Sequence, residues 1–124
     1  MELPVKVVVF NNGALGFVEV EMKSSGYVTF RTDLRNPSFA KVGEAMGLFG
    51  VRVERPEQLR PALQAALLHK GPALIEVLTH RLELAMPPTI TVEEAKGFSL
   101  YMLRTVMNGR GDELIDLAKT NLFH

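Results

Sequence analysis

The first part of the chain carries its most pronounced apolar pattern. Residues 5–10 form a nearly continuous run of β-branched and aromatic side chains, interrupted only by Lys6. Such a run is typical of a strand buried on both faces in a parallel sheet. It ends in Asn11-Asn12-Gly13, and a helix-compatible segment follows over residues 14–23. This order places the polar turn at the carboxyl end of a strand, where open α/β sheets bind their ligands.

The middle of the chain alternates between helical and extended patterns. The predicted elements are helices over residues 37–46 and 56–70 and strands over residues 49–54 and 73–78. Asn36-Pro37 is a typical helix start, with Asn36 as the cap. A weaker extended segment follows over residues 82–85. The alternation predicts an α/β fold, a partial doubly wound, Rossmann-like parallel sheet of three to four strands with flanking helices and further carboxyl-terminal helices.

The last third of the sequence predicts two helices after an extended connector at Met86-Pro87-Pro88. Thr91 and Glu94 have the spacing of a capping box, and the helix that they begin extends to about Met107. The final helix is amphipathic; its apolar residues are Leu114, Ile115, Leu117, Ala118 and Leu122, with Phe123 directly after them. We therefore expect three parts: an α/β domain over residues 1–86, a connector and helix over 87–108, and an amphipathic tail over 109–124.

Composition excludes several classes of function. The 14 basic and 14 acidic side chains cancel, so no net field attracts nucleic acid. The absence of cysteine excludes disulfides, thiolate metal sites and cysteine nucleophiles. No apolar run approaches the roughly 20 residues of a membrane span, and we expect a cytoplasmic protein. His69, His80 and His124 share no spacing typical of metal ligands or catalytic bases, and we expect them at the surface.

Two longer stretches carry a family resemblance. The run LPVKVVVFNNGALGFVEVEMK resembles the second half of the thiamine diphosphate motif, which closes with a pair of asparagines. Together with AKGFSLYMLR and GRGDELIDLAKTN, it is similar to the carboxyl-terminal part of bacterial pyruvate oxidases, the quinone-dependent pyruvate dehydrogenases. The Gly-Asp-Gly half that opens the motif does not occur in this sequence. We therefore expect a carboxyl-terminal portion of the cofactor domain, inactive by itself.

The resemblance implies a site at the turn and the helix start. The residues implied to bind thiamine diphosphate are Asn11, Asn12, Gly13, Ala14, Leu15, Gly16 and Phe17. Two of them would bind Mg²⁺, Asn12 through its side-chain oxygen and Ala14 through its backbone carbonyl. Phe17 would lie near the cofactor, and Glu21 would border the substrate pocket. From the residues alone, three other interpretations stay open: Asn-Asn-Gly as simple turn chemistry, Phe17 as a core residue, and Glu21 on a solvated helix face.

The resemblance also implies a reaction and partners. Pyruvate would be oxidatively decarboxylated to acetate and CO₂, with electrons passing through FAD, bound elsewhere in the parent enzyme, to a membrane quinone. The tail would make peripheral contact with lipid at the inner face of the cell membrane, although from composition alone an amphipathic stripe is more often an intramolecular or subunit-packing surface than a membrane anchor. We also expect a homo-oligomer. The alternatives are a fragment similar to acetolactate synthase or another thiamine diphosphate decarboxylase, and a non-catalytic α/β assembly module.

Overall fold

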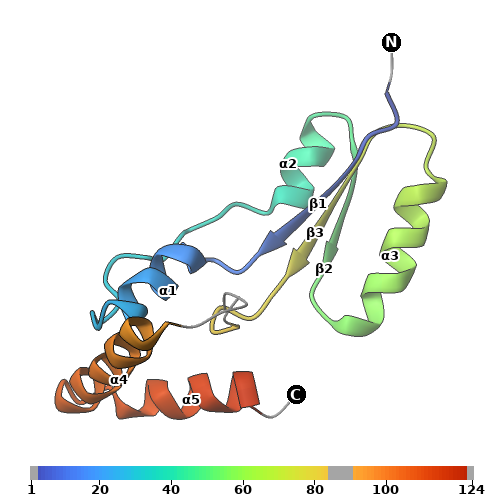
Figure 1. The fold of residues 1–124 in the computed structure, drawn as a ribbon. Helices are drawn as coiled ribbons and strands as arrows, with labels where there is room; N and C mark the ends of the chain where they lie inside the picture. Colours follow the sequence, from blue (N-terminus) through green and yellow to red (C-terminus); the bar gives the residue numbers. More distant parts are fainter. Residues whose placement is uncertain (1–2, 84–90, 123–124) are drawn as a thin grey trace. The chain divides into compact units, whose positions relative to one another are not determined.

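A computed structural model describes residues 3–83 and 91–122 and confirms the α/β class (Figure 1). The elements are β1 (Lys6–Asn11), α1 (Gly16–Ser24), α2 (Phe39–Ala45), β2 (Phe49–Val53), α3 (Pro56–Leu68), β3 (Ala73–Leu78), α4 (Val92–Met107) and α5 (Gly111–Leu122). They form two compact units: a sheet unit of Met1–Gly13 and Arg35–Thr79, and a helical unit of Ala14–Leu34 and His80–His124. The sequence predicts a division of the chain by roles in a larger protein, into residues 1–86, 87–108 and 109–124. That division stays a prediction.

The sheet unit is built on three parallel strands in the order β1-β3-β2. Because side chains alternate along a strand, Ile75 and Val77 of the central β3 point to one face and Glu76 to the other. The first face packs against Ala62 and Ala66 of α3 and makes the apolar core of this unit. The other face is covered by α2, whose Ala40 is buried. This arrangement places the end of β1, where the polar turn begins, beside the end of β3 (Figure 1).

The prediction that the first strand is buried on both faces is wrong for this chain. Val8 and Phe10 are 41% and 72% exposed, and Val7 is 40% exposed. The reason is that β1 lies at the edge of the sheet and pairs with β3 alone, while α2 and α3 pack on β2 and β3. An apolar run therefore identified the strand correctly and its burial incorrectly.

The start of α2 also differs from its prediction. The N-cap is Ser38, whose hydroxyl accepts a 3.4 Å hydrogen bond from the backbone N–H of Lys41, and the helix begins at Phe39. Asn36 does not cap this helix. Its side-chain amide donates instead to Asn11, 25 residues earlier, at 2.8 Å.

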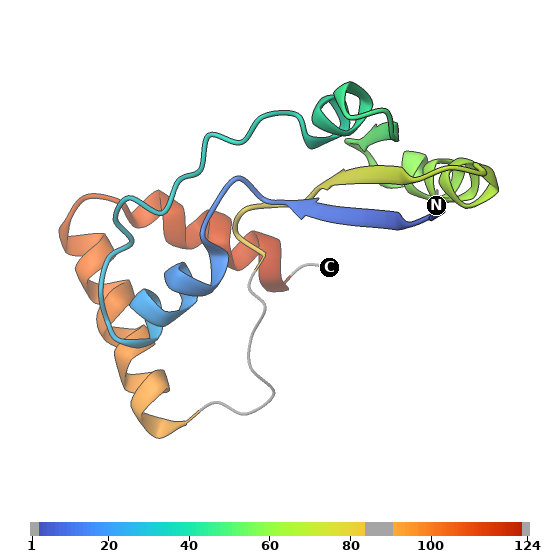
Figure 2. The same ribbon diagram turned by 90° about the horizontal axis from the view of Figure 1, so that it is seen from above.

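The helical unit consists of α1, α4 and α5, and both views show α1 beside α4 (Figures 1 and 2). The predicted capping box of α4 is confirmed, with Thr91 and Glu94 bonding each other's backbone N–H groups. Gly97 of α4 lets the helices approach closely, since a Cβ atom there would lie 1.6 Å from the carbonyl oxygen of Ser24.

The remaining predictions for the last third are confirmed in part. Leu82 lies in a turn rather than an extended segment, and the connector at residues 86–88 is outside the described residues. In α5, Leu117 is buried while Ile115 is 57% exposed. The side chains of Leu122 and Phe123 are likewise outside the description. In the residues that are described, no helix combines the length and apolarity needed to cross a membrane.

Candidate functional site

The polar turn predicted from the sequence begins at the last residue of β1. Asn11 Oδ1 accepts a 3.2 Å hydrogen bond from the backbone N–H of Gly13, which closes the turn locally. Gly13 has φ +65°, a left-handed conformation that residues with a Cβ adopt at a cost. The chain therefore bends here, and Asn12 lies between these two residues.

The side chain of Asn11 is engaged inside the sheet unit. Its Nδ2 donates to Oε1 of Glu76 at 2.8 Å, and its Oδ1 also accepts from Asn36 Nδ2 at 2.8 Å. Both the NH₂ group and the oxygen of the Asn11 amide are therefore hydrogen-bonded within the protein.

Glu76 is an ionisable residue in the middle of the central strand, and it is fully buried. Beyond Asn11, its oxygens accept from Arg52 Nη1 at 3.0 Å, Ser38 Oγ at 3.2 Å and the backbone N–H of Ala40 at 3.2 Å. Burial by itself raises the pKa of this carboxyl group, but the bonds from Asn11 and Ala40 and the charge of Arg52 outweigh it. The pKa of Glu76 is therefore below its ordinary value, and the group is ionised at neutral pH.

The donor set at the turn suits a hard cation in part. Asn12 is half-buried at the end of the sheet unit, and Ala14, two residues later, is a buried residue of the helical unit. A side-chain amide oxygen and a backbone carbonyl are the neutral oxygen ligands that Mg²⁺ accepts. Among the described residues, no group of three or more histidine, aspartate or glutamate side chains is placed to hold a metal. Asn12 and Ala14 each offer one oxygen of the type that Mg²⁺ binds, and a complete Mg²⁺ site would need further ligands.

The other implied site residues lie at the start of α1. Leu15 precedes the helix and is 43% exposed, and Gly16 is its first residue. Phe17 is 77% exposed, so the interpretation of Phe17 as a core residue is wrong for the described structure. Glu21, one turn later, is also exposed. Phe17 and Glu21 therefore stay pocket candidates whose side chains are open to solvent.

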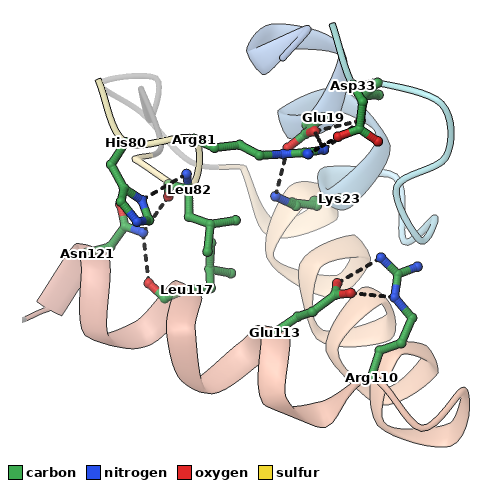
Figure 3. A network of polar contacts seen from close by, with 11 residues as sticks. Glu19, Lys23, Asp33, His80, Arg81, Leu82, Arg110, Glu113, Leu117 and Asn121 are labelled. Atoms are coloured by element: carbon green, nitrogen blue, oxygen red, sulfur yellow. Dashed lines mark hydrogen bonds and ion pairs between the residues drawn. The ribbon is translucent and has the colours of Figure 1, made fainter. Parts of the chain in front are cut away.

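The buried face of α1 is charged, which the sequence pattern did not predict. Glu19 accepts from Arg81 Nη2 at 2.6 Å and from the hydroxyl of Thr32 at 2.6 Å, and Arg81 also binds Asp33 (Figure 3). Lys23 Nζ lies 3.6 Å from Glu19. This network ties α1 to the loop before α2 and to the segment after β3 within the helical unit.

Burial and ion pairing have opposite effects on these charges. Burial raises the pKa of Glu19, but hydrogen bonds from Thr32 and Arg81 outweigh it and hold the pKa below its ordinary value. Burial also lowers the pKa of Lys23, and the charge of Glu19 compensates for this in part. The carboxylate of Glu19 is thus well stabilised, while Lys23 depends on Glu19 for its charge.

A cavity of about 430 Å³ opens beside this network. Its lining includes Lys23, Arg81 and Arg110, which could mark an anion site. However, Arg81 pairs with Glu19 and Asp33, Lys23 with Glu19, and Arg110 with Glu113 at 2.6 Å (Figure 3). Because these cations are neutralised by acidic partners in the same lining, the cavity offers no excess positive charge to an anion.

Sequence reasoning missed Glu76, Glu19 and Lys23. A weak signal existed for Glu76, the one charged residue in the strand ALIEVL. Glu19 and Lys23 have the i, i+4 spacing of a helical ion pair, but this spacing is common on solvated helix faces. The sequence does not show that both are buried.

The fold and the turn together define a class of protein. An open parallel α/β sheet with a polar turn after a strand is the arrangement of ligand-binding α/β domains. The family described as "Thiamine pyrophosphate enzyme, C-terminal TPP binding domain" matches residues 1–77, and the chain belongs to this family. Thiamine pyrophosphate is another name for thiamine diphosphate. The implied cofactor domain is therefore confirmed at the level of the family.

Curated relatives agree with this membership. A thiamine pyrophosphate-containing protein of Bacillus subtilis, YdaP, is 35% identical over 119 residues, which cover 96% of this chain and 21% of the relative. The mitochondrial acetolactate synthase of Schizosaccharomyces pombe is 35% identical over 69% of this chain and 13% of its own length. The catalytic subunit of the Saccharomyces cerevisiae enzyme is 41% identical over 60% of this chain and 11% of its length. The chain thus spans about a fifth or less of the length of these relatives.

Proposed function

We propose that this chain forms the carboxyl-terminal part of the cofactor site in an enzyme that uses thiamine diphosphate to decarboxylate a 2-oxo acid, pyruvate. The observation that supports this most directly is the turn at residues 11–13. It lies at the carboxyl end of β1, inside the segment matched by the thiamine pyrophosphate family. The non-catalytic assembly module is disfavoured because it gives no reason for this placement.

In this proposal Asn12 contributes its side-chain oxygen and Ala14 its backbone carbonyl to the Mg²⁺ that accompanies the diphosphate. When bound, the cofactor supplies the electron sink for decarboxylation. Asn11 and Gly13 hold the turn in shape, while Phe17 would lie near the cofactor and Glu21 would border the substrate pocket. Two neutral ligands bind Mg²⁺ weakly, because this ion gives up its water reluctantly. We therefore expect the isolated chain to be catalytically inactive.

The reaction that the named relatives favour is the formation of acetolactate. Several of the relatives are acetolactate synthases, from yeasts and from Escherichia coli, at 32% to 41% identity. In this reaction two molecules of pyruvate would give one acetolactate and one CO₂. The product retains all carbons except the released CO₂, and no external oxidant is consumed.

A second candidate is the oxidation of pyruvate to acetate and CO₂, with FAD and quinone as electron acceptors. Its support is the resemblance of AKGFSLYMLR and GRGDELIDLAKTN to pyruvate oxidases. The match to the Bacillus protein, whose name specifies no reaction, covers 96% of this chain, whereas the two yeast acetolactate synthases cover 69% and 60%. The helices α4 and α5 are therefore matched by a relative that is not named as an acetolactate synthase. FAD, quinone and contact of the tail with lipid belong to this candidate.

A chimeric enzyme tests the two reactions. The segment of the Escherichia coli acetolactate synthase isozyme 2 that matches this chain is replaced by the corresponding residues of this chain. We expect the chimera to form acetolactate from pyruvate, and the same chimera with Asn12→Ala to lose that activity while remaining folded. A matching chimera in the Bacillus protein, assayed for pyruvate-dependent dye reduction, tests the second candidate. Equal activity with and without Asn12 would contradict the proposed role of this residue.

The tail requires a separate test. Leu117 is buried within the helical unit and Asn121 Nδ2 donates to the carbonyl of Leu82 at 2.9 Å, which favours packing. Co-sedimentation with liposomes, with and without residues 109–124, distinguishes packing from contact with lipid. Sedimentation of the chain alone tests the expected homo-oligomer.

A further inference from the structure

The carboxylate of Glu76 connects the centre of the sheet unit to the polar turn. Glu76 lies between Val9 of β1 and Arg52 of β2 in the strand register. An ionised carboxylate accepts hydrogen bonds and donates none, whereas an asparagine amide does both. The 2.8 Å contact with Glu76 therefore requires that Asn11 present its Nδ2 to the carboxylate.

This requirement fixes the other end of the same amide. With Nδ2 on Glu76, the Oδ1 atom of Asn11 faces the backbone N–H of Gly13 at 3.2 Å. That bond closes the turn in which Gly13 takes φ +65°. If the amide were reversed, its oxygen would face a carboxylate and its NH₂ group would face an N–H donor, so both contacts would be repulsive.

From this chain of contacts we propose that Glu76 is a positioning residue for the cofactor turn. Its buried charge orients the Asn11 amide, and the amide holds Gly13, so that Asn12 is presented in one conformation. The expected effect of Glu76 on cofactor binding rests on the proposed function, because Asn12 is the Mg²⁺ ligand in that proposal. The link from Glu76 to Gly13 is a property of the unliganded chain.

The simpler interpretation is that Glu76 only stabilises the sheet and the start of α2. Its bonds to Ser38 and to the backbone N–H of Ala40 serve that purpose. The two interpretations differ at the turn. If Glu76 only stabilised the sheet unit, its substitution would affect Gly13 no more than any other equally destabilising substitution in that unit.

NMR of the ¹⁵N-labelled 124-residue chain separates them. In Glu76→Gln, we expect the Asn11 side-chain protons to exchange with solvent about tenfold faster or more, because a hydrogen bond to a charged group is lost. The backbone amide signal of Gly13 should move as well. The matched control is Ser38→Ala, which removes a different donor from the same carboxylate and should leave both signals in place.

A double variant that exchanges the carboxylate and the amide between positions 76 and 11 tests whether the turn can be restored. In the double variant Asn11→Asp with Glu76→Gln, the acceptor-only group is at position 11 and the amide at position 76. The carboxylate at position 11 can then accept from both the new side-chain amide and the N–H of Gly13. We expect the Gly13 signal to return toward its wild-type position. Absence of movement in Glu76→Gln, or equal movement in Ser38→Ala, would overturn the proposal.

Cofactor binding is measured on the same samples with thiamine diphosphate and Mn²⁺, a paramagnetic ion with ligand preferences like those of Mg²⁺. The midpoint for broadening of the Asn12 signals should rise about tenfold in Glu76→Gln and stay unchanged in Ser38→Ala. Absence of binding in the wild type would contradict the proposed function of this chain, while the Gly13 and Asn11 signals still decide the role of Glu76.

A last measurement applies if Glu76→Gln fails to fold by circular dichroism. In the wild type, the side-chain protons of Asn11 should exchange more slowly than those of Asn36, whose amide is exposed and binds only a neutral oxygen. Equal exchange of the two side chains would overturn the proposal.

Discussion

Lys23 Nζ lies 3.6 Å from Oε2 of Glu19, and both side chains are buried within the helical unit. The two partners are not equivalent. Glu19 also accepts hydrogen bonds from Arg81 and Thr32, each at 2.6 Å, whereas Lys23 otherwise faces the ring of Tyr101, 5.8 Å away. Loss of Glu19 therefore leaves a buried cation without its anion, while loss of Lys23 leaves an anion that is still compensated.

This asymmetry predicts unequal effects of two substitutions. Glu19→Gln should lower the free energy of unfolding by about 3–5 kcal/mol, the range for removing one partner from a buried ion pair. Lys23→Met, which keeps the volume and removes the charge, should change it by less than about 1.5 kcal/mol. Urea denaturation followed by circular dichroism measures both. A larger loss for Lys23→Met than for Glu19→Gln would contradict the assignment of Glu19 as the centre of this network.

Stability should fall in acid because of the buried carboxylates. The pKa values of Glu76 and Glu19 are lowered from the ordinary value of 4.5, so the unfolded chain takes up protons at a higher pH than the folded one. The stabilisation is therefore fully present above pH 4.5 and is lost as the pH falls below this value through the folded pKa values. Urea midpoints measured from about pH 7 to about pH 3 should stay level and then drop. Glu76→Gln should reduce the drop, and an unchanged acid profile in that variant would contradict an ionised Glu76.

Gly97 should be intolerant of even a methyl group. Gly97→Ala places a Cβ within 1.6 Å of the Ser24 carbonyl oxygen, so α1 and α4 must separate. We expect a loss of about 1–3 kcal/mol, although alanine is the better helix former by about 1 kcal/mol. Gly111→Ala at the start of α5 is the matched control, since its nearest neighbour is a Val106 methyl carbon at 4.0 Å. Thermal denaturation compares the two, and equal melting temperatures would show that the helices are not in close contact.

The sequence predicted those parts of the fold that depend on local pattern. Residues 5–10 and 73–78 are apolar runs that became β1 and β3, and Thr91 with Glu94 forms the expected capping box. Burial was predicted less well, because it depends on which neighbours cover a strand. The exposure of Phe10 results from the position of β1 at the sheet edge, which an apolar run does not specify.

The candidate site shows the same limit. The position of the Asn-Asn-Gly turn followed from the order of strand and helix, and the resemblance supplied the roles of Asn12 and Ala14. The pairing of Asn11 with Glu76 spans 65 residues, and Asn36 bonds Asn11 instead of capping α2. These contacts depend on the parallel pairing of β1 with β3, so no local sequence pattern predicts them.

The central claim is that the turn at residues 11–13 is part of a site for a metal and a diphosphate. The most direct test is an NMR titration of the ¹⁵N-labelled chain with thiamine diphosphate and Mn²⁺, which detects weak binding because the ion broadens the signals of nearby residues. We predict broadening at Asn12 and Ala14 that saturates, is absent at α3, requires thiamine diphosphate, and disappears in Asn12→Ala. Broadening that is identical in Asn12→Ala, or none at residues 11–17 at millimolar cofactor, would contradict the account.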